Sequence, residues 1–335
     1  MTRLLVIGGT TFLGRHITDQ AIARDHRLTL FNRGLTNPEL FPEAEHLRGD
    51  RDGGLAPLEG REFDAVIDTS GYLPRVVSAS ARLLADRVGH YTFVSSVSVY
   101  DGNGGAGSDP DSPVAVLDDP TTEEITDDAY GPLKALCERV VHEALPERTL
   151  VIRPGLIVGP DDPTDRFTYW PARIADGGSV LAPGDPDART QVIDVRDLAA
   201  FMLDLTERRI TGTLNAVGPA QPLTLGELLA ACVAVTGSGA ELVWAENALL
   251  HEHGVEPWSD LPLWLGGDPA MEWVDHVDPA PAVARGLRTR PHAETILATL
   301  EWHRANLDAP GRAGFKMTRA REAELLAAVA SAIGT

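Results

Sequence analysis

Residues 3–14 read RLLVIGGTTFLG, and this stretch decides the fold of the 335-residue chain. The aliphatic run Arg3–Ile7 has the composition of a buried strand, and the apolar residues that follow recur at helical spacing as far as Arg24. Gly8 and Gly9 stand between these two segments and permit a sharp turn. A strand that turns through glycines into a helix points the helix N-terminus at an anion, so we expect a phosphate-binding turn here.

Strand-like and helix-like segments alternate along the first half of the chain. Further strands are expected at Arg27–Phe31, His46–Leu47, Phe63–Ile67, His90–Ser95 and Thr149–Ile152, and further helices at Val76–Ala85 and Asp128–Leu145. The strands are continuous apolar runs, as in parallel strands that are covered on both faces. We therefore expect an α/β fold with a Rossmann-type, doubly wound parallel sheet.

Beyond Arg153 the pattern is irregular, and this part holds all six tryptophans. Strands are expected near Gln191–Val195 and Thr213–Ala216, and helices at Asp197–Thr206, Thr224–Thr236, His292–Ala305 and Arg319–Ala332, with Asp197 as a helix cap. We expect residues 1–160 to form a dinucleotide-binding domain whose sheet is completed by parts of 185–220. Residues 161–335 are expected to form mainly a smaller C-terminal substrate-binding domain.

The segment 101–129 interrupts the alternation. It is rich in Gly, Pro and Asp, and it holds nine acidic residues and no Lys or Arg. Long loops inside compact domains are usually functional or mobile. A solvated acidic excursion is the alternative interpretation.

The composition excludes several classes of protein. Asp and Glu number 49 against 29 Lys and Arg, for a net charge of −20. A surface that follows phosphates needs the opposite sign, so we expect no nucleic-acid partner. No apolar run reaches the ~18 residues of a membrane span, and the N-terminal run lacks a signal cleavage site. The two cysteines are too few for a disulfide framework, and the sequence His251-Glu252-His253 lacks a third ligand. We expect a cytoplasmic protein without a membrane segment or a metal.

The strongest catalytic signal is a Tyr-x-x-x-Lys motif. The chain has only two lysines, and one of them, Lys134, follows Tyr130 by four residues. On a helix this spacing places both side chains on one face. An ammonium group beside a phenol stabilises the phenolate and lowers the pKa of the tyrosine, which then serves as an acid–base near neutral pH. The lysine can also anchor ribose hydroxyls. A surface Tyr–Lys pair on an amphipathic helix is the alternative.

The glycine turn and the Tyr130–Lys134 pair together resemble the extended and atypical short-chain dehydrogenase/reductases, the NAD-dependent epimerase/dehydratase-like family. The resemblance covers nearly the whole chain and is densest as far as Asp197. The family's glycine pattern is Gly-x-x-Gly-x-x-Gly, and Thr11 stands here at the middle glycine. Some atypical members carry a similar Gly-Gly-Thr-x-Phe-Leu-Gly variant, so the resemblance implies a bound dinucleotide.

The resemblance also implies a catalytic serine at the end of the fifth strand. Ser96 takes that position and would hydrogen-bond the substrate oxygen as charge develops on it. Ser95 and Ser98 are the alternatives, as residues that cap the strand end. Family dehydratases have Thr-Asp-Glu at this place, and Ser96-Val97-Ser98 lacks the acid pair that a sugar 4,6-dehydratase needs.

The end of the second strand indicates which coenzyme is bound. An acid there would favour NAD, but the chain has Asn32-Arg33, and Arg33 can pair with a 2′-phosphate. We therefore expect NADP in preference to NAD, with a solvated turn arginine as the alternative. The other cofactor-binding residues that the resemblance implies are Gly8, Thr10, Thr11, Phe12, Leu13, Gly14, Asp50, Arg51, Ser70, Gly71, Lys134, Arg153 and Pro154.

Substrate contacts are expected from Ser96, Val97, Arg166, Tyr169 and Trp170, and core packing is the alternative for the aromatic residues. The expected partner is a small molecule, sugar-like or aromatic, and the protein a monomer or homodimer. The expected function is that of an NAD(P)-dependent oxidoreductase, which transfers hydride at a carbonyl or hydroxyl carbon. A nucleotide-sugar epimerase with retained NAD is one alternative. A non-catalytic dinucleotide-sensing or RNA-binding protein is the alternative from another class.

Overall fold

The computed structural model describes residues 2–102, 107–308 and 310–333. Residues 103–106 of the predicted acidic loop therefore lie outside the described residues. The strands are β1 (Arg3–Ile7), β2 (Arg27–Asn32), β3 (Glu45–Arg48), β4 (Ala65–Asp68), β5 (Tyr91–Val94), β6 (Thr149–Pro154), β7 (Leu156–Val158), β8 (Ser179–Pro183), β9 (Val192–Asp194), β10 (Gly212–Ala216) and β11 (Glu241–Ala245). The helices are α1 (Phe12–Ala23), α2 (Pro74–Leu84), α3 (Asp127–Ala144), α4 (Tyr169–Ala175), α5 (Val195–Glu207), α6 (Leu225–Thr236), α7 (Asn247–Glu252), α8 (Ala280–Ala284), α9 (His292–Ala305) and α10 (Arg319–Ile333). Short 3₁₀ turns are η1 (Ala56–Leu58), η2 (Val97–Val99) and η3 (Glu272–Asp275).

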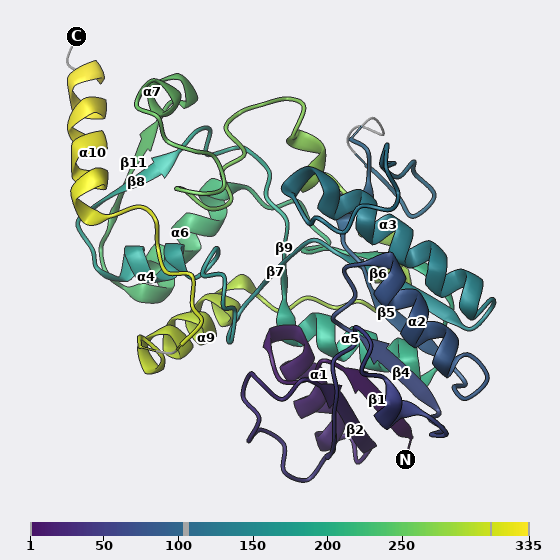
Figure 1. The fold of residues 1–335 in the computed structure, drawn as a ribbon. Coiled ribbons are helices and arrows are strands. Elements are labelled where there is room, and N and C mark those ends of the chain that lie inside the picture. The colour runs from purple at the N-terminus through teal and green to yellow at the C-terminus, as the bar shows by residue number, and fades with distance from the viewer. Residues whose placement is uncertain (1, 103–106, 309, 334–335) are drawn as a thin grey trace.

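A seven-stranded sheet forms the centre of the first part, in the order β10-β6-β5-β4-β1-β2-β3 (Figure 1). All of its neighbouring strands pair in parallel; Leu4, for example, pairs with Leu28 on one side and with Ala65 on the other. The expected Rossmann-type, doubly wound sheet is confirmed. Because the strands are parallel, their carboxyl ends meet at one edge, where such folds bind ligands.

The two faces of the sheet are covered by different helices. Leu4 and Val6 of β1 pack into a core with α1 and α5, and their neighbours Leu5 and Ile7 pack into a second core with α2 and α3. Alternate residues of a strand point to opposite faces, so an entirely apolar strand needs a helix layer on both sides. This arrangement explains why the strands of the first half are uninterrupted apolar runs.

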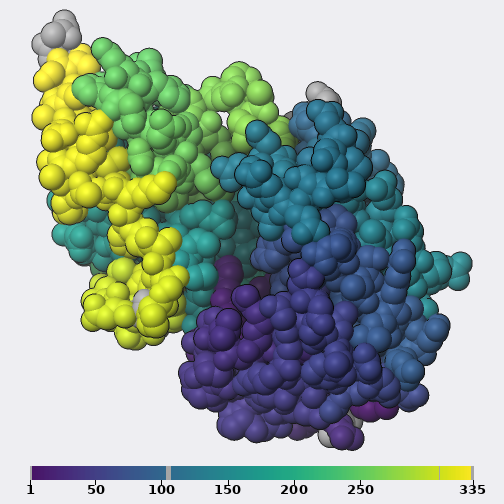
Figure 2. All heavy atoms as spheres, in the orientation of Figure 1, coloured from purple at the N-terminus to yellow at the C-terminus, as the bar shows by residue number. Residues whose placement is uncertain are grey.

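The second part of the chain has its own core, built around the parallel pair β8 and β11 and the helices α4, α6, α9 and α10. Trp170 is fully buried in it and donates its indole N–H to the carbonyl of Pro262 at 2.8 Å. Figures 1 and 2 show this part, teal to yellow, beside the sheet domain, which begins in purple and blue, with the molecular surface hollowed between them. The boundary expected at residue 160 stays a prediction.

The sequence predictions differ from the structure mainly after residue 153. The strand expected near Thr213–Ala216 is β10, and it completes the sheet. The strand expected near Gln191–Val195 is β9, and it pairs with β7 outside the sheet. The strands β7, β8 and β11 and the helices α4, α7 and α8 were not predicted. Within the described residues, none of the helices is long and apolar enough to cross a membrane.

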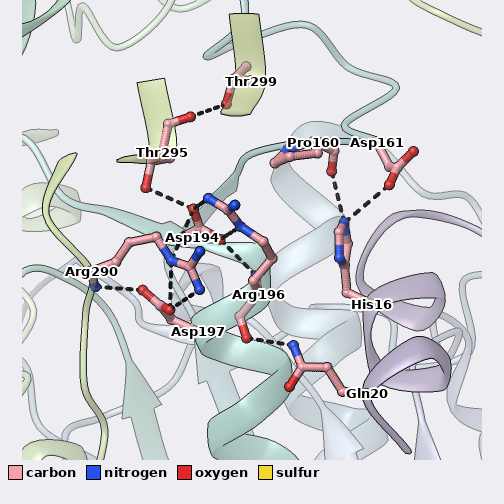
Figure 3. A network of polar contacts seen from close by, with 10 residues as sticks. All are labelled: His16, Gln20, Pro160, Asp161, Asp194, Arg196, Asp197, Arg290, Thr295 and Thr299. Carbon is pink, nitrogen blue, oxygen red and sulfur yellow. Dashed lines mark hydrogen bonds and ion pairs between the residues drawn. The ribbon is translucent and has the colours of Figure 1, made fainter. Parts of the chain in front are cut away.

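A polar network joins the two parts where β9 runs into α5 (Figure 3). Asp194 caps α5 by accepting the backbone N–H of Arg196, pairs with the guanidinium of Arg196 at 2.6 Å, and accepts the hydroxyl of Thr295 in α9 at 2.7 Å. Asp197, the cap expected from the sequence, instead binds Arg290 at 2.7 Å. The prediction for Asp197 is therefore wrong, because Asp194 holds the N-cap position and Asp197 lies within the first turn of the helix.

A second set of contacts in Figure 3 links α1 to the loop after β7. The imidazole of His16 lies 3.1 Å from the carbonyl of Pro160 and 3.2 Å from the carboxylate of Asp161. Asp161 also accepts the indole N–H of Trp302 in α9 at 3.0 Å. One carboxylate thus holds the helix that follows the glycine turn against the second part of the chain.

The C-terminal helix is fastened by a buried ion pair. Glu322 in α10 lies 2.7 Å from the guanidinium of Arg173 in α4, and both side chains are at most 5% exposed. Glu322 also accepts the backbone N–H of Leu181 in β8 at 3.1 Å. A buried pair of this kind is costly to break because the remaining charge has no partner.

Glu322→Gln is expected to lower the free energy of unfolding by about 3 kcal/mol, since Arg173 would stay buried without its carboxylate. Urea unfolding followed by circular dichroism measures this change. Glu324→Gln on the same helix is the matched control, because its pair with Arg321 is exposed and should contribute less than about 1 kcal/mol. Equal losses in the two variants would contradict the prediction.

Candidate functional site

A cavity of about 990 Å³ opens at the carboxyl ends of the parallel strands and extends to the second part of the chain. Its volume is at the upper end of the ~300–1,000 Å³ typical of ligand sites. The sequence-predicted residues that line it are Gly8, Thr10, Thr11, Phe12, Leu13, Gly14, Asn32, Arg33, Asp50, Arg51, Ser70, Ser96, Val97, Tyr130, Lys134, Pro154 and Arg166. Residues that lie far apart in the chain thus meet at one surface.

The glycine turn is shaped for close approach of a ligand to the backbone. Gly8 and Gly9 have φ values of +109° and +93°, which favour glycine. A β-carbon on Gly14 would lie only 2.7 Å from the backbone nitrogen of Gly9. Thr11 stands at the N-cap of α1, but its side chain forms no capping hydrogen bond. The first N–H groups of α1 therefore remain available for an anion, which fits the pyrophosphate of a dinucleotide.

The end of β2 carries an exposed arginine at the cavity wall. In the described part of the chain, no hydrogen bond or ion pair engages the guanidinium of Arg33. The Asn32 side chain, in contrast, is held in place: it donates to the carbonyl of Gly8 at 2.9 Å and accepts from the guanidinium of Arg48 at 2.5 Å. Asn32 thus braces the glycine turn, while Arg33 can reach a ligand.

The two residues after Gly49 differ in environment. Asp50 is exposed at the cavity, and its carboxylate accepts the backbone N–H of Asp52 at 2.9 Å. Arg51 is buried, and its guanidinium forms two hydrogen bonds of 2.7 and 2.5 Å with the fully buried carboxylate of Asp68. Arg51 therefore neutralises Asp68 beneath the sheet edge, which limits the cofactor contact expected from its guanidinium.

Lys134 lies at the floor of the cavity. Its ammonium group donates to the carbonyls of Gly71 and Val94, at 2.6 Å each, and sits 4.4 Å from the ring centre of Phe93. Burial lowers the pKa of Lys134 to about 8. Gly71 is thus a hydrogen-bond acceptor for the lysine, and its loop positions the cation between the ends of β4 and β5.

Tyr130 and Ser96 meet in the same cavity. Burial raises the pKa of Tyr130, the neighbouring Tyr72 raises it further, and a hydrogen bond with Ser96 acts in the opposite direction. The rings of Tyr72 and Tyr130 are 6.4 Å apart. The expected lowering of the Tyr130 pKa by Lys134 is therefore wrong, because the ammonium is turned toward two backbone carbonyls. Ser96 itself caps η2 by accepting the N–H of Ser98.

Four predicted site residues do not line the cavity: Gly71, whose carbonyl binds Lys134, and the three residues Arg153, Tyr169 and Trp170. Arg153 is buried, and its guanidinium lies 2.7 Å from the carboxylate of Glu138 and stacks 5.0 Å from the ring of Tyr100. Tyr169 and Trp170 are buried in the second core and do not line the cavity. For these two aromatic residues, the core alternative holds and the substrate prediction is wrong.

Arg166 does line the cavity. Its Nε donates to the hydroxyl of Thr164 at 3.1 Å, and its guanidinium carbon lies 6.0 Å from the ring centre of Trp258. No carboxylate of the described residues forms an ion pair with it. A guanidinium in this setting can bind a phosphate or carboxylate group of a ligand.

The acidic segment before α3 reaches the rim of the cavity through Ile125. Arg75 at the start of α2 binds Glu123 of this segment at 2.6 Å and Asp52 at 2.7 Å. Part of the local negative charge is thus neutralised at the rim.

Many residues of the cavity wall were not predicted as site residues, among them Tyr72, Gln191, Trp258 and Asp275. Tyr72 follows the predicted Ser70-Gly71 loop and could have been found from that position. Trp258 and Asp275 come from irregular segments and carry no local motif. Among the described residues, no group of three or more His, Cys, Asp or Glu side chains could hold a metal ion.

Comparison with known proteins relates part of this chain to a known family. Residues 64–216 match the model of the NAD dependent epimerase/dehydratase family. A curated relative, the chloroplast stem-loop binding protein of 41 kDa b of Arabidopsis thaliana, is 24% identical over 256 residues. That match covers 70% of this chain and 63% of the relative, so the chain matches less than two thirds of that protein.

Solved structures share the fold at low sequence identity. The UDP-glucuronic acid 4-epimerase of Bacillus cereus, in complex with NAD, is 15% identical with a TM-score of 0.65, over 90% of this chain and 98% of that one. The human epimerase family protein SDR39U1, with NADPH, is 20% identical with a TM-score of 0.61, over 89% of this chain and 99% of that one. Similarity at this level establishes the fold, with coenzymes of both kinds among the structural neighbours.

Proposed function

Because residues 64–216 carry a domain of the NAD dependent epimerase/dehydratase family, we propose that this protein is an NAD(P)-dependent oxidoreductase of the short-chain dehydrogenase/reductase type. One observation carries the proposal: the glycine turn, Ser96, Tyr130 and Lys134 all line a single cavity. The turn fits a dinucleotide, and the three side chains can act on an oxygen beside it. The reaction is hydride transfer at a carbonyl or hydroxyl carbon.

The chain's own residues would hold the coenzyme along the strand ends. The backbone N–H groups of Gly8–Gly14 would bind the pyrophosphate of the coenzyme. Asp50 would contact the adenosine part, and Ser70 would line the neighbouring wall of the cavity. Lys134 would anchor the hydroxyls of the nicotinamide ribose, and Pro154 would line the nicotinamide. When bound, the nicotinamide supplies or accepts the hydride.

Tyr130 would handle the proton of the reaction. A raised pKa keeps the phenol protonated, and a protonated phenol is the group that donates to a carbonyl oxygen during reduction. Ser96 would hydrogen-bond the same oxygen as negative charge develops on it. In the oxidative direction the same group would take up the proton, so this role of Tyr130 fits a reductase and an epimerase alike.

Arg33 supports NADP as the preferred coenzyme. Its guanidinium lies at the cavity wall at the end of β2, free of carboxylate partners among the described residues. A 2′-phosphate would give it the paired, charge-assisted hydrogen bonds that NAD lacks. The ligand partners proposed here are a small molecule and this coenzyme.

An RNA-binding function is the second candidate, because the curated relative is named a stem-loop binding protein. The net charge of −20 counts against it, since RNA contacts need basic surface. Filter binding with a stem-loop RNA at physiological salt separates the candidates. Saturable retention of the RNA on the filter would favour RNA binding, and no retention would favour the oxidoreductase function. Nicotinamide released from purified, denatured protein would favour an epimerase that retains NAD.

Tyr130→Phe is expected to lower hydride-transfer turnover at least about 100-fold, because the proton donor is removed while the ring is kept. The measurement is absorbance at 340 nm with NADPH and a panel of aldehydes, ketones and nucleotide sugars. Tyr169→Phe is the control, since it removes a phenol outside the cavity and should keep wild-type turnover. Wild-type turnover in Tyr130→Phe would refute its acid role.

Arg33→Ala is expected to weaken NADPH binding by about tenfold while changing NADH binding little, because only NADPH carries the 2′-phosphate. Titration of coenzyme fluorescence gives both dissociation constants. Arg27→Ala, at the opposite end of β2, controls for the lost charge. Equal weakening of both coenzymes by Arg33→Ala would remove the proposed preference.

A further inference from the structure

A buried carboxyl group lies in the cavity wall and has no role in the steps above. Asp275 ends the short turn η3 and is only 5% exposed, yet it lines the cavity. One of its oxygens accepts the backbone N–H of Gln191 at 2.9 Å. Within the described ranges, no hydrogen bond or ion pair engages its other oxygen.

This situation differs from that of three other buried carboxylates. Asp68, Glu138 and Glu322 are each paired with an arginine at 2.7 Å or less. Burial raises the pKa of Asp275 to about 7, although the Gln191 N–H and the charge of Arg189, which forms no ion pair with it among the described residues, act in the opposite direction. An unpaired buried carboxyl group costs stability, and such groups are concentrated at functional sites.

The surroundings hold Asp275 firmly in place. The side chain of Gln191 donates to the carbonyl of Val277 at 2.9 Å and accepts the N–H of the same residue at 3.1 Å. Val277 packs in one apolar cluster with Val97, the cavity residue next to Ser96. The segment that carries Asp275 is therefore fastened to the segment that carries the proposed catalytic serine.

Two further residues of the same cavity are suited to a polar organic molecule. Arg166 offers a cation without a carboxylate partner among the described residues, and Trp258 offers an aromatic face beside it. An anionic group of a ligand would be attracted by Arg166 and repelled by Asp275. A hydroxyl group, in contrast, can donate to the available oxygen of Asp275.

We infer that Asp275 is a specificity-determining residue of the cavity, which accepts a hydrogen bond from a hydroxyl group of the substrate. The substrate class is then a hydroxylated molecule with an anionic group, which binds Asp275 through the hydroxyl and Arg166 through the anion. The inference rests on the proposed function, since it takes the part of the cavity that these two residues line to be the substrate site.

Asp275→Asn separates this role from a purely structural one. The asparagine keeps the oxygen that accepts the Gln191 N–H and keeps the shape, but it replaces the carboxylate by a neutral amide. UDP-glucose and UDP are the probes, because UDP-glucose carries the hydroxyl-bearing sugar and UDP lacks it. Isothermal titration calorimetry gives both affinities, with and without NADPH.

The wild type is expected to bind UDP-glucose more tightly than UDP, and Asp275→Asn should reduce that ratio by about tenfold while leaving UDP affinity unchanged. Glu272→Gln is the matched control, since it makes the same chemical change on the exposed start of the same turn. The control should keep the wild-type ratio. A Tm for Asp275→Asn at or above the wild-type value shows that the fold is intact.

The inference is overturned if the wild type does not discriminate between the two probes. It is also overturned if Asp275→Asn keeps the wild-type ratio, or if UDP affinity falls as much as UDP-glucose affinity. Failure of the proposed function is seen separately, as absence of NADPH and NADH binding in the wild type.

Discussion

The close approach of α1 to the end of β1 is the constraint on which the rest of the site depends. A β-carbon on Gly8 would lie 2.4 Å from the hydroxyl oxygen of Thr69, so a larger residue would force the strand and its neighbour apart. Because the turn is tight, α1 begins beside the ends of β4 and β5. Lys134 and Ser96 are positioned at those same ends. Any ligand held by the turn is therefore presented to the side chains of α3.

The fold of the first half could be predicted because each signal there is local. β1 begins and ends where its apolar run does, and α3 begins within one residue of the expected position. Most strands of the second half could not be predicted in this way, and the reason is physical. Its strands are short, and some are partly exposed. In β11 most residues are only half-buried, so neither a continuous apolar run nor a strict alternation appears there.

The residues of the site also differ in how far the sequence predicts their positions. Tyr130 and Lys134 share one helix turn, so their spacing predicts their proximity. Asp275 and Trp258 reach the cavity through irregular segments, and long-range packing alone places them there. Trp170 shows the opposite error: a large aromatic residue suits a ligand site and a core equally well, and no periodicity distinguishes them.

The sequence also did not indicate which charged side chains form ion pairs with one another. Arg51 and Arg153 occupy motif positions, but each is neutralised by a buried carboxylate from another element. Arg33 and Arg166, which no local signal separates from them, remain without such partners among the described residues. The positive groups available to a ligand are thus fewer than the motifs suggest, and both of them line the same cavity.

The scarcity of lysine has a practical consequence for chemistry on this protein. Lys316 is exposed, whereas Lys134 is only 3% exposed beneath the cavity, with its pKa lowered to about 8. A larger share of the Lys134 amine is therefore uncharged and nucleophilic at mildly alkaline pH than for an ordinary lysine. An acylating reagent that enters the cavity would therefore modify the amine of Lys134. A molecule bound in the cavity would protect that amine, so the extent of modification of the one peptide that contains Lys134 would report whether the cavity is occupied.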